Sequence, residues 1–298
     1  MIRKAIIPAA GFGTRFLPAA KSQPKEMLPI VDTPTIQYVV EEAVAAGIRD
    51  ILMVIGKSKR AIEEHFDRNF ELENELEEKG KTADLAAIRH ISSMANIHFV
   101  WQKELKGLGD AIRCGRDHMG REPFAVLLGD TLIDAKTPVT KQLLAGYERY
   151  HESVCALEEV PREKVSRYGV IKGKPVKDGL FMVEDFVEKP SPSEAPSNLA
   201  IAGRYVFTAD IFDYITKTTP GKNGEIQITD AMRLMVRDRA MYGLRFEGTR
   251  YDIGNKLDFL RTNIIYALKR KDLSKDLHAF LRQLVAENKK AAAFQGPE

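Results

Sequence analysis

In the first half of the chain, short apolar runs alternate with longer segments in which apolar residues recur every three or four positions. Residues 33–48 have this helical spacing, with Thr33 placed as an N-cap and Pro34 at the first helical position. Continuous apolar strands that alternate with helices predict an α/β fold with a mainly parallel sheet, in which ligands gather at the carboxyl ends of the strands. The runs of strand length are residues 4–10, 50–56, 97–102 and 124–130.

The pattern changes further along the chain. Residues 68–95 are highly charged at their start and have weak strand character, which predicts a solvated helical excursion. After residue 152 shorter strand candidates surround a Pro/Ser-rich loop at 189–198, which predicts a β-rich subdomain on the same sheet. From Lys256 the helical spacing predicts a packed helix pair or an oligomer contact. We therefore expect one domain at 1–255, with halves at 1–151 and 152–255, and a C-terminal helical tail at 256–298.

Composition narrows the class of protein. The 298 residues are 44% hydrophobic, which suffices for a substantial core. Cys114 and Cys155 have no CxxC spacing, so neither a disulfide framework nor a zinc site is indicated. Lys plus Arg number 45 against 42 Asp plus Glu, and the two signs are interspersed, which gives no support to a nucleic-acid partner. No apolar run has the length of a signal or a membrane span, so we expect a cytoplasmic protein without a membrane partner.

The most specific local pattern is GxGTRxxPxxKxxPKxxLP at residues 11–29. It is not a dinucleotide fingerprint, because Phe16 stands where the third glycine belongs, and GxxxxGK[ST] is absent. Backbone amides around Ala10, Gly11 and Gly13 can approach a nucleotide closely, because no side chain blocks them. Arg15 and Lys25 can then hold its β- and γ-phosphates. Either charge alone is typical of a solvated surface, but beside a glycine loop at a strand end the pair indicates phosphate binding.

This segment resembles the signature of sugar-1-phosphate nucleotidyltransferases, and residues 24–48 are similar to the UTP–glucose-1-phosphate uridylyltransferases of bacteria and archaea. Further blocks follow in that family's order, among them QKELKGLGDAI, LLGDTL, RYGVI, FVEKP, NGEIQITDA and YDIGNKLDF. The resemblance implies a Rossmann-like (GT-A-like) fold whose mixed, mainly parallel sheet is flanked by helices, with a sugar-binding subdomain in the second half. It also implies the Mg²⁺-assisted transfer of uridylyl from UTP to glucose 1-phosphate, giving UDP-glucose and pyrophosphate, in a homodimer or homotetramer.

Two aspartates are the predicted metal ligands. Asp130 ends the apolar run 124–130, so a buried strand brings its carboxylate to the ligand edge of the sheet, where such a group commonly holds Mg²⁺. Asp252 follows another short strand candidate. The resemblance implies that both hold the metal, although an aspartate beside a turn is by itself more often a cap. Asp130 is the better supported of the two.

Gln102 is the predicted reader of the base. Its amide offers one donor and one acceptor side by side, which complements uracil and mismatches adenine. The resemblance implies that Gln102 and the Gly107 backbone contact uracil, and that Ala9 and Glu26 belong to the substrate site. The alternative is a glutamine that merely ends an edge strand.

The segment FVEKP contributes Glu188 and Lys189. Their side chains point to opposite faces if the strand continues, and both face the site only if a turn begins before Pro190. The resemblance implies that Glu188 contacts sugar hydroxyls, that Lys189 contacts the sugar's phosphate, and that Gly169 lets the hexose lie against backbone. An exposed Glu–Lys pair is the alternative.

The reaction requires no covalent intermediate from the protein. The six histidines share no ligand spacing, no serine sits in a GxSxG elbow, and a sugar 1-phosphate is already largely ionised near neutral pH. Alternatives are another nucleotidyltransferase, using dTTP or a different hexose 1-phosphate, and a non-catalytic regulatory relative. Retention of Arg15, Lys25, Asp130, Lys189 and Asp252 argues against the last.

Three positions depart from the usual family pattern: Ala20, Asp110 and Thr131. Asp110 adds a negative charge near the predicted nucleotide, and Thr131 removes a possible second carboxylate beside the metal. These departures affect the expected rate and nucleotide preference more than the reaction class.

Overall fold

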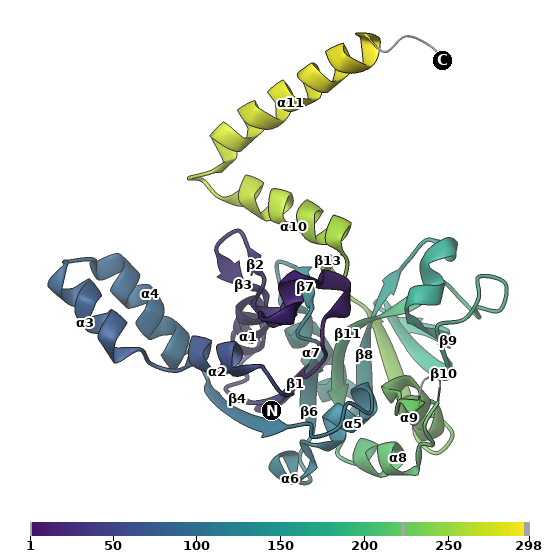
Figure 1. The fold of residues 1–298 in the computed structure, drawn as a ribbon. Coiled ribbons are helices and arrows are strands. Elements are labelled where there is room, and N and C mark those ends of the chain that lie inside the picture. The colour runs from purple at the N-terminus through teal and green to yellow at the C-terminus, as the bar shows by residue number, and fades with distance from the viewer. Residues whose placement is uncertain (1, 222–223, 295–298) are drawn as a thin grey trace.

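The computed structural model describes residues 2–221 and 224–294 (Figure 1). Within these residues a nine-stranded sheet runs in the order β5-β4-β1-β6-β11-β8-β12-β10-β9. The first four of these strands are parallel, and each coincides with one of the predicted apolar runs. They are β5 (Asn96–Trp101), β4 (Asp50–Ile55), β1 (Lys4–Ala9) and β6 (Phe124–Leu127).

The second half of the chain continues the same sheet with a different strand pattern. β11 (Leu199–Phe207) is antiparallel to both β6 and β8 (Ser153–Glu159), and β12 (Met241–Arg245) is parallel to β8. β9 (Gly169–Lys177) and β10 (Leu180–Glu188) form a hairpin whose two turn residues, Asp178 and Gly179, both have positive φ. The α/β class is therefore confirmed. The sheet is mixed, and its continuous parallel part is the N-terminal half.

Two small two-stranded sheets show where the predicted ends of a helix and a strand were wrong. β2 (Pro29–Ile30) pairs with β3 (Thr33–Pro34), so α1 (Thr35–Ala45) begins two residues after the predicted N-cap. The prediction that Thr33 caps this helix is wrong, because Thr33 and Pro34 are extended and paired. β6 likewise ends at Leu127, where the chain turns into β7 (Thr131–Asp134), which pairs with β13 (Thr249–Asp252). Asp130 therefore lies in a turn and not at the end of the strand.

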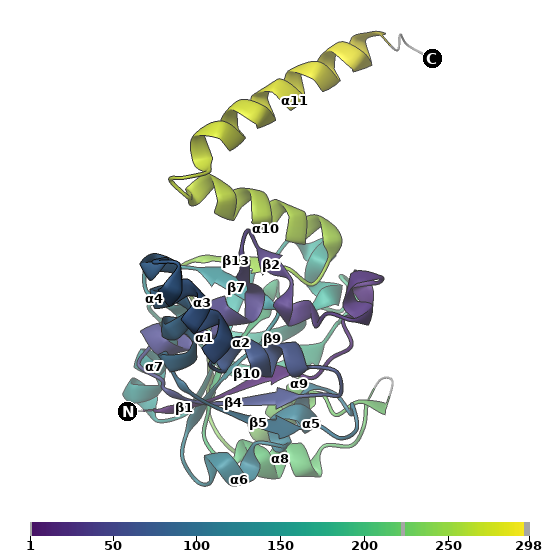
Figure 2. The ribbon, with the colours of Figure 1, turned by 60° about the vertical axis from the view of Figure 1, so that its left-hand side comes forward.

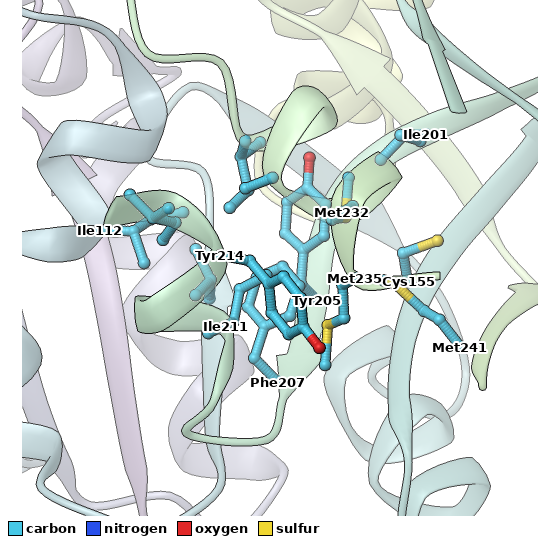
Figure 3. Close-up of a cluster of buried hydrophobic side chains, with 14 of the residues drawn as sticks. Ile112, Cys155, Ile201, Tyr205, Phe207, Ile211, Tyr214, Met232, Met235 and Met241 are labelled. Carbon is cyan, nitrogen blue, oxygen red and sulfur yellow. The ribbon is translucent and has the colours of Figure 1, made fainter. Parts of the chain in front are cut away.

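Helices cover both faces of the sheet, and consecutive strand residues point to opposite cores. Ile6 packs in a cluster with β11 and with the helices α8 and α9, whereas Ile7 packs with α1 and α7. Figure 3 shows the first of these cores, in which Tyr205 and Phe207 of β11 lie against Met232 and Met235 of α9. The covering helices are α5 (Leu108–Arg113), α6 (Arg116–Met119), α7 (Val139–Tyr150), α8 (Ile211–Lys217) and α9 (Ile228–Met235).

Two helical additions leave this body. After α2 (Arg60–Phe66), the helices α3 (Phe70–Glu78) and α4 (Thr82–Ser93) form the predicted excursion. α10 (Lys256–Lys269) and α11 (Ser274–Phe294) lie in the predicted C-terminal tail, and α11 projects far from the sheet in both views (Figures 1 and 2). Among the described helices, none combines the length and the apolar composition that a bilayer crossing requires.

Candidate functional site

Several predicted site segments meet at one edge of the sheet, because the parallel strands end there. β1 runs into the glycine loop, β5 is followed by Gln102, and the turn after β6 carries Asp130. Together they line a cavity of about 530 Å³, which we call the glycine-loop cavity. The predicted residues that line it are Ala10, Gly11, Gly13, Lys25, Glu26, Gln102, Gly107 and Asp130. The side chain of Ala9, by contrast, is buried in the core.

The glycine loop is held close to the residues that follow it. Gly13 has φ +67°, and a Cβ at this position would lie 2.9 Å from the Lys25 Cβ, so a larger residue fits neither the backbone nor the space. The buried Lys59 ammonium also holds the loop: it donates to the Gly11 carbonyl at 2.7 Å and to a Glu26 carboxylate oxygen at 2.7 Å. Burial raises the pKa of Glu26, although the charges of Lys59 and Lys25 oppose this.

Lys59 was not identified from the sequence. The sequence feature that could have indicated it is the basic segment after β4, which lies near the glycine loop. A lysine in a loop is, however, usually a solvated charge. The structure shows that it instead fixes the loop and Glu26. The Glu26 carboxylate thus lines the cavity while it is already paired.

Lys25 and Asp130 form an ion pair inside the cavity, with the ammonium 2.6 Å from a carboxylate oxygen. Burial opposes the charged form of Asp130, but the charges of Lys25 and Arg15 outweigh it and hold the pKa of Asp130 below its usual value. Burial also opposes the charge on Lys25, and the carboxylates of Asp130 and Glu26 nevertheless raise the pKa of Lys25. Both groups are therefore charged over the ordinary pH range.

Gln102 is nearly buried at the other end of the cavity. Its amide nitrogen donates to an Asp110 carboxylate oxygen at 2.9 Å and to the Gly107 carbonyl at 3.2 Å. The expectation that Gln102 offers donor and acceptor side by side is thus corrected, because the donor is used within the protein. Asp110, the departure from the family pattern, is buried and paired with Arg113 at 2.6 Å. Gly107 has φ +96°, and a Cβ there would meet the Ile226 carbonyl at 2.8 Å.

A second cavity of about 740 Å³, which we call the basic cavity, adjoins the first across Leu128. Arg15 lines this cavity with Lys189 and Asp252, although the sequence grouped it with Lys25. Four further cations were missed, and the basic run before Gly169 was a sequence signal for two of them, Lys164 and Arg167. The cations of the cavity are Arg15, Lys164, Arg167, Lys189, Arg250 and Arg261, against the carboxylates of Asp252 and Asp258.

The turn at Lys189 matches the second alternative for FVEKP. β10 ends at Glu188, and Lys189 has φ +47°, so the chain turns before Pro190. The two side chains form an ion pair at 2.8 Å. Gly169 lies beside them, since a Cβ there would come within 3.2 Å of a Glu188 oxygen. Thr229 also donates to this oxygen, at 2.7 Å.

Behind the wall between the cavities lies Arg204, which the sequence did not single out. Its side chain is fully buried and pairs with Glu42 at 2.9 Å. Its guanidinium also donates to the carbonyls of Leu128 at 3.2 Å and Thr131 at 2.7 Å. These carbonyls flank Asp130, so Arg204 fixes the turn that carries it.

The two predicted metal ligands are brought together by the β7–β13 ribbon, which pairs Asp252 with Thr131, the residue after Asp130. Both side chains are partly exposed carboxylates, a donor set that suits Mg²⁺. Tyr168 donates to one Asp252 oxygen at 2.9 Å and the Gly254 amide to the other at 3.0 Å. Each oxygen retains a lone pair, so the residues fit this ion. The bond to Gly254 shows that Asp252 also caps its turn.

A model of the nucleotidyl transferase family matches residues 4–268 of the chain. Two curated relatives are UTP–glucose-1-phosphate uridylyltransferases. The one from Bacillus subtilis (strain 168) is 52% identical over 284 residues, which are 95% of this chain and 97% of that relative. The one from Staphylococcus epidermidis is 54% identical over 283 residues, with 95% and 98% covered.

Solved structures agree with this similarity. A UDP-glucose pyrophosphorylase complexed with UDP-glucose has a TM-score of 0.84 and 45% identity, covering 91% of this chain and 100% of its own. A UTP-bound UGPase from Acinetobacter baumannii has a TM-score of 0.87 and 38% identity, covering 96% and 99%. The similarity therefore extends over nearly the whole length of every chain compared.

Proposed function

Since this chain belongs to the UTP–glucose-1-phosphate uridylyltransferases of the nucleotidyl transferase family, we propose that its two adjoining cavities divide the substrates of that reaction. The enzyme transfers the uridylyl group of UTP to glucose 1-phosphate and releases UDP-glucose and pyrophosphate. The observation that carries the proposed division is the shared Leu128 wall, with Asp130 in one cavity and Asp252 in the other.

We place UTP in the glycine-loop cavity. The amides around Gly11 and Gly13 approach its phosphates, and Lys25 neutralises them. Uracil lies at Gln102 and Gly107. In this arrangement the α-phosphorus comes to the wall between the cavities, where the Asp130 turn is held by Arg204.

We place glucose 1-phosphate in the basic cavity, whose cations suit a phosphate dianion. Lys189 binds the phosphate, and Glu188 contacts sugar hydroxyls near Gly169. Arg15 lies on this side of the wall, so we assign it to the reacting phosphates where the two substrates meet. The Rossmann-like parallel half then serves the nucleotide, and the β-rich half serves the sugar.

The reaction is an in-line displacement. A phosphate oxygen of glucose 1-phosphate forms a bond to the α-phosphorus of UTP while the bond from that phosphorus to the bridging oxygen of pyrophosphate breaks. The nucleophile is already ionised, so the chain supplies positioning and positive charge and needs no general base. We propose that Asp130 and Asp252 hold Mg²⁺, which when bound neutralises charge on phosphate oxygens.

We further propose that the enzyme assembles with itself through α10 and α11. α10 packs on β2 and β13 and α11 projects from the body (Figure 2), and both helices expose large apolar side chains to water, which is unfavourable. A second copy of the tail is the occupant we propose, giving the expected homodimer or homotetramer. The cytoplasmic location and the boundaries at residues 151 and 255 stay predictions from the sequence. The exposed side chains are Leu257, Leu260, Ile264, Phe280, Leu284 and Val285.

Pyrophosphate release tests the assignment. UTP, dTTP, CTP, ATP and GTP are each supplied with several hexose 1-phosphates, with and without Mg²⁺. We expect the highest kcat/KM for UTP with glucose 1-phosphate and dependence on the metal. A higher value for dTTP or another sugar would change the proposed substrate, and no turnover with any pair would favour the regulatory alternative.

A further inference from the structure

A group of possible metal ligands lies near the amino-terminal end of β4, whereas both cavities lie at the carboxyl ends of the parallel strands. Asp50 is the first residue of β4, His98 lies on β5, and His118 on α6. One ligand atom from each residue lies within 4.8 Å of those of the other two. The six-residue strand β4 separates Asp50 from the ligand edge by about 16 Å, at roughly 3.3 Å per residue. This group is therefore distinct from the predicted Mg²⁺ site.

The geometry converges on one oxygen. The Nε2 atom of His118 lies 2.8 Å from Asp50 Oδ1, and the Nε2 atom of His98 lies 3.7 Å from the same atom. Atoms that share a tetrahedral ion at about 2.0–2.1 Å are separated by roughly 3.3 Å, a value between these two distances. Small shifts of both rings, His118 away from the Asp50 oxygen and His98 toward it, therefore let one ion contact all three atoms.

The backbone positions these side chains. The register of β4 and β5 pairs Leu52 with His98, so these two side chains lie on the same face of the sheet. Residues two apart on a strand point the same way, so Asp50 lies on that face as well. α6 lies below this face, and Lys4 fixes it by donating to the His118 carbonyl at 3.1 Å. The side chains of Asp50 and His118 are 33% and 27% exposed, so an ion can reach them from solvent without unfolding the site.

We propose that Asp50, His98 and His118 form a second divalent metal site, selective for a borderline transition ion such as Zn²⁺ over Mg²⁺. Imidazole nitrogen suits Zn²⁺, whereas Mg²⁺ prefers an oxygen shell. Three protein ligands leave a coordination position for water.

Titration of the untagged chain with ZnCl₂ tests this site. We expect saturable binding that raises the melting temperature, and that His98→Ala or His118→Ala weakens by about tenfold or more. His90→Ala, which changes an exposed histidine of α4, is the matched control and should bind as the parent does. Excess Mg²⁺ should not displace the ion, and Co²⁺ should give visible absorption bands that His118→Ala alters.

Absence of saturable Zn²⁺ binding would overturn the proposal. Equal affinity in the parent and both histidine variants would also overturn it, because groups that all three proteins share, such as Cys114 or the Asp130 and Asp252 carboxylates, would then account for the binding. If His118→Ala loses stability, His98→Ala still decides the question, since its side chain is 52% exposed.

A second and independent inference concerns the base end of the glycine-loop cavity, and it rests on the proposed function. Gln102 and Asp110 are both buried residues, with 6% and 5% exposed. The Gln102 amide nitrogen has two hydrogens, and both are donated, one to Asp110 and one to the Gly107 carbonyl. A carboxylate and a carbonyl only accept, so these partners fix which end of the amide faces them.

The Gln102 carbonyl oxygen is consequently the polar atom left for a ligand. We infer that Asp110 is a positioning residue that makes Gln102 accept but not donate. Uracil and thymine have an N3–H that this oxygen accepts, whereas cytosine has an acceptor at N3 and meets it with like polarity. Asp110 therefore selects against CTP and leaves UTP and dTTP to be separated by other contacts.

Asp110→Ala tests the inference through a ratio. Release from Asp110 lets the Gln102 amide turn, so the UTP-to-CTP ratio of kcat/KM should fall by about tenfold or more. A merely structural loss would lower both values together and leave the ratio unchanged. Arg113→Gln is the matched control, because it removes the other partner of Asp110 and keeps the bond to Gln102.

An unchanged ratio in Asp110→Ala, with a parent that prefers UTP, would overturn the role of Asp110 alone. A parent without UTP turnover would instead overturn the proposed function. The two failures are therefore distinguishable in one series of assays.

Discussion

At the scale of single residues, Asp130 is fixed through its main chain as well as through its charge. Arg204 holds the carbonyls on both sides of the turn, and Lys25 pairs with the carboxylate. The main-chain contacts do not depend on the identity of the side chain. A change of the carboxylate should therefore alter the chemistry of the site and leave the turn in place.

We predict that Asp130→Asn and Asp252→Asn each lower turnover by on the order of 10²-fold or more, as expected for loss of one preorganised electrostatic group. Both changes keep the shape and remove a charge from the proposed Mg²⁺ site. Steady-state pyrophosphate release measures the effect. The melting temperature without ligand should stay near that of the parent for Asp252→Asn and should fall for Asp130→Asn, which leaves the Lys25 ammonium without its ion-pair partner. The stabilisation by Mg²⁺ with UDP-glucose should largely disappear in both variants.

Asp84→Asn is the control, because Asp84 is exposed on α4 far from both cavities. Near-normal Mg²⁺-dependent turnover in either site variant would remove that aspartate from the metal site. For Asp252 its structural bonds to the Gly254 amide and the Tyr168 hydroxyl would then be its whole role.

Arg204→Met should destabilise the protein by about 3–5 kcal/mol, because it leaves the Glu42 carboxylate buried without its cation. Urea unfolding measures the change. Arg149→Met, which alters a half-exposed side chain on α7, should cost far less. A loss in Arg204→Met no larger than in this control would show that the buried pair does not support the turn.

The sequence indicated site residues that stand in a short, recognisable segment. It did not indicate residues whose partners lie far away along the chain. The glycine loop, Lys25 and Asp130 each stand in a short recognisable segment. Lys59 pairs with Glu26 across 33 positions, and Arg204 with Glu42 across 162. No pattern of spacing reveals such contacts. The donor of Gln102 was likewise assigned to the base, because its use by Asp110 depends on how α5 packs.

At the scale of elements, the apolar runs predicted the parallel strands well, since a strand buried on both faces needs an unbroken apolar sequence. The residues at which helices and strands begin and end were less predictable. Thr33 and Pro34 carry a helix-start signal, but their pairing with β2 prevails over it. The antiparallel pairing of β11 with β6 and β8 could not be read from the sequence, because the residues of a strand do not indicate the direction of its neighbours.

The α3–α4 excursion has its own electrostatic support. The buried Glu73 carboxylate accepts from Arg68 at 2.6 Å and from Arg89 of α4 at 2.9 Å. These hydrogen bonds, that of Arg68 first, lower the pKa of Glu73 to about 2. A depressed pKa means that the folded state favours the charged form. The stabilisation is therefore fully present above about pH 4.5, the ordinary pKa of a glutamate in an unfolded chain. It is lost as the pH falls toward 2.

We predict that the excursion loses protection against amide hydrogen exchange between pH 4.5 and 2 before the sheet does. Mass spectrometry of peptides from residues 70–93, corrected for intrinsic exchange rates, measures this. Glu73→Gln should reduce protection at neutral pH and remove its acid dependence. Glu77→Gln, at a largely exposed neighbour, is the control. Equal acid dependence in the parent and in Glu73→Gln would assign the effect to other groups.

At the scale of the whole molecule, the tail is the feature least explained by one chain alone. Phe280 and Leu284 are 58% and 41% exposed on a helix that projects from the body. We predict that Leu284→Glu lowers the molar mass seen by light scattering, because a charge disrupts an apolar contact between copies. Lys275→Glu, at an exposed polar position of the same helix, should leave the mass unchanged. An equal mass for parent and Leu284→Glu would place the contact elsewhere.

The strand order has a consequence for the order in which the chain emerges from the ribosome. β6 lies between β1 and β11, yet β6 ends at residue 127 and β11 begins only at residue 199. At about 5–20 residues per second, the apolar edge of β6 waits on the order of ten seconds for its partner. Such an edge readily pairs with another nascent chain. The separately expressed fragment 1–151 should therefore sediment as aggregate where the full chain stays in the supernatant, and cells that make this enzyme should depend on holdase chaperones during that interval.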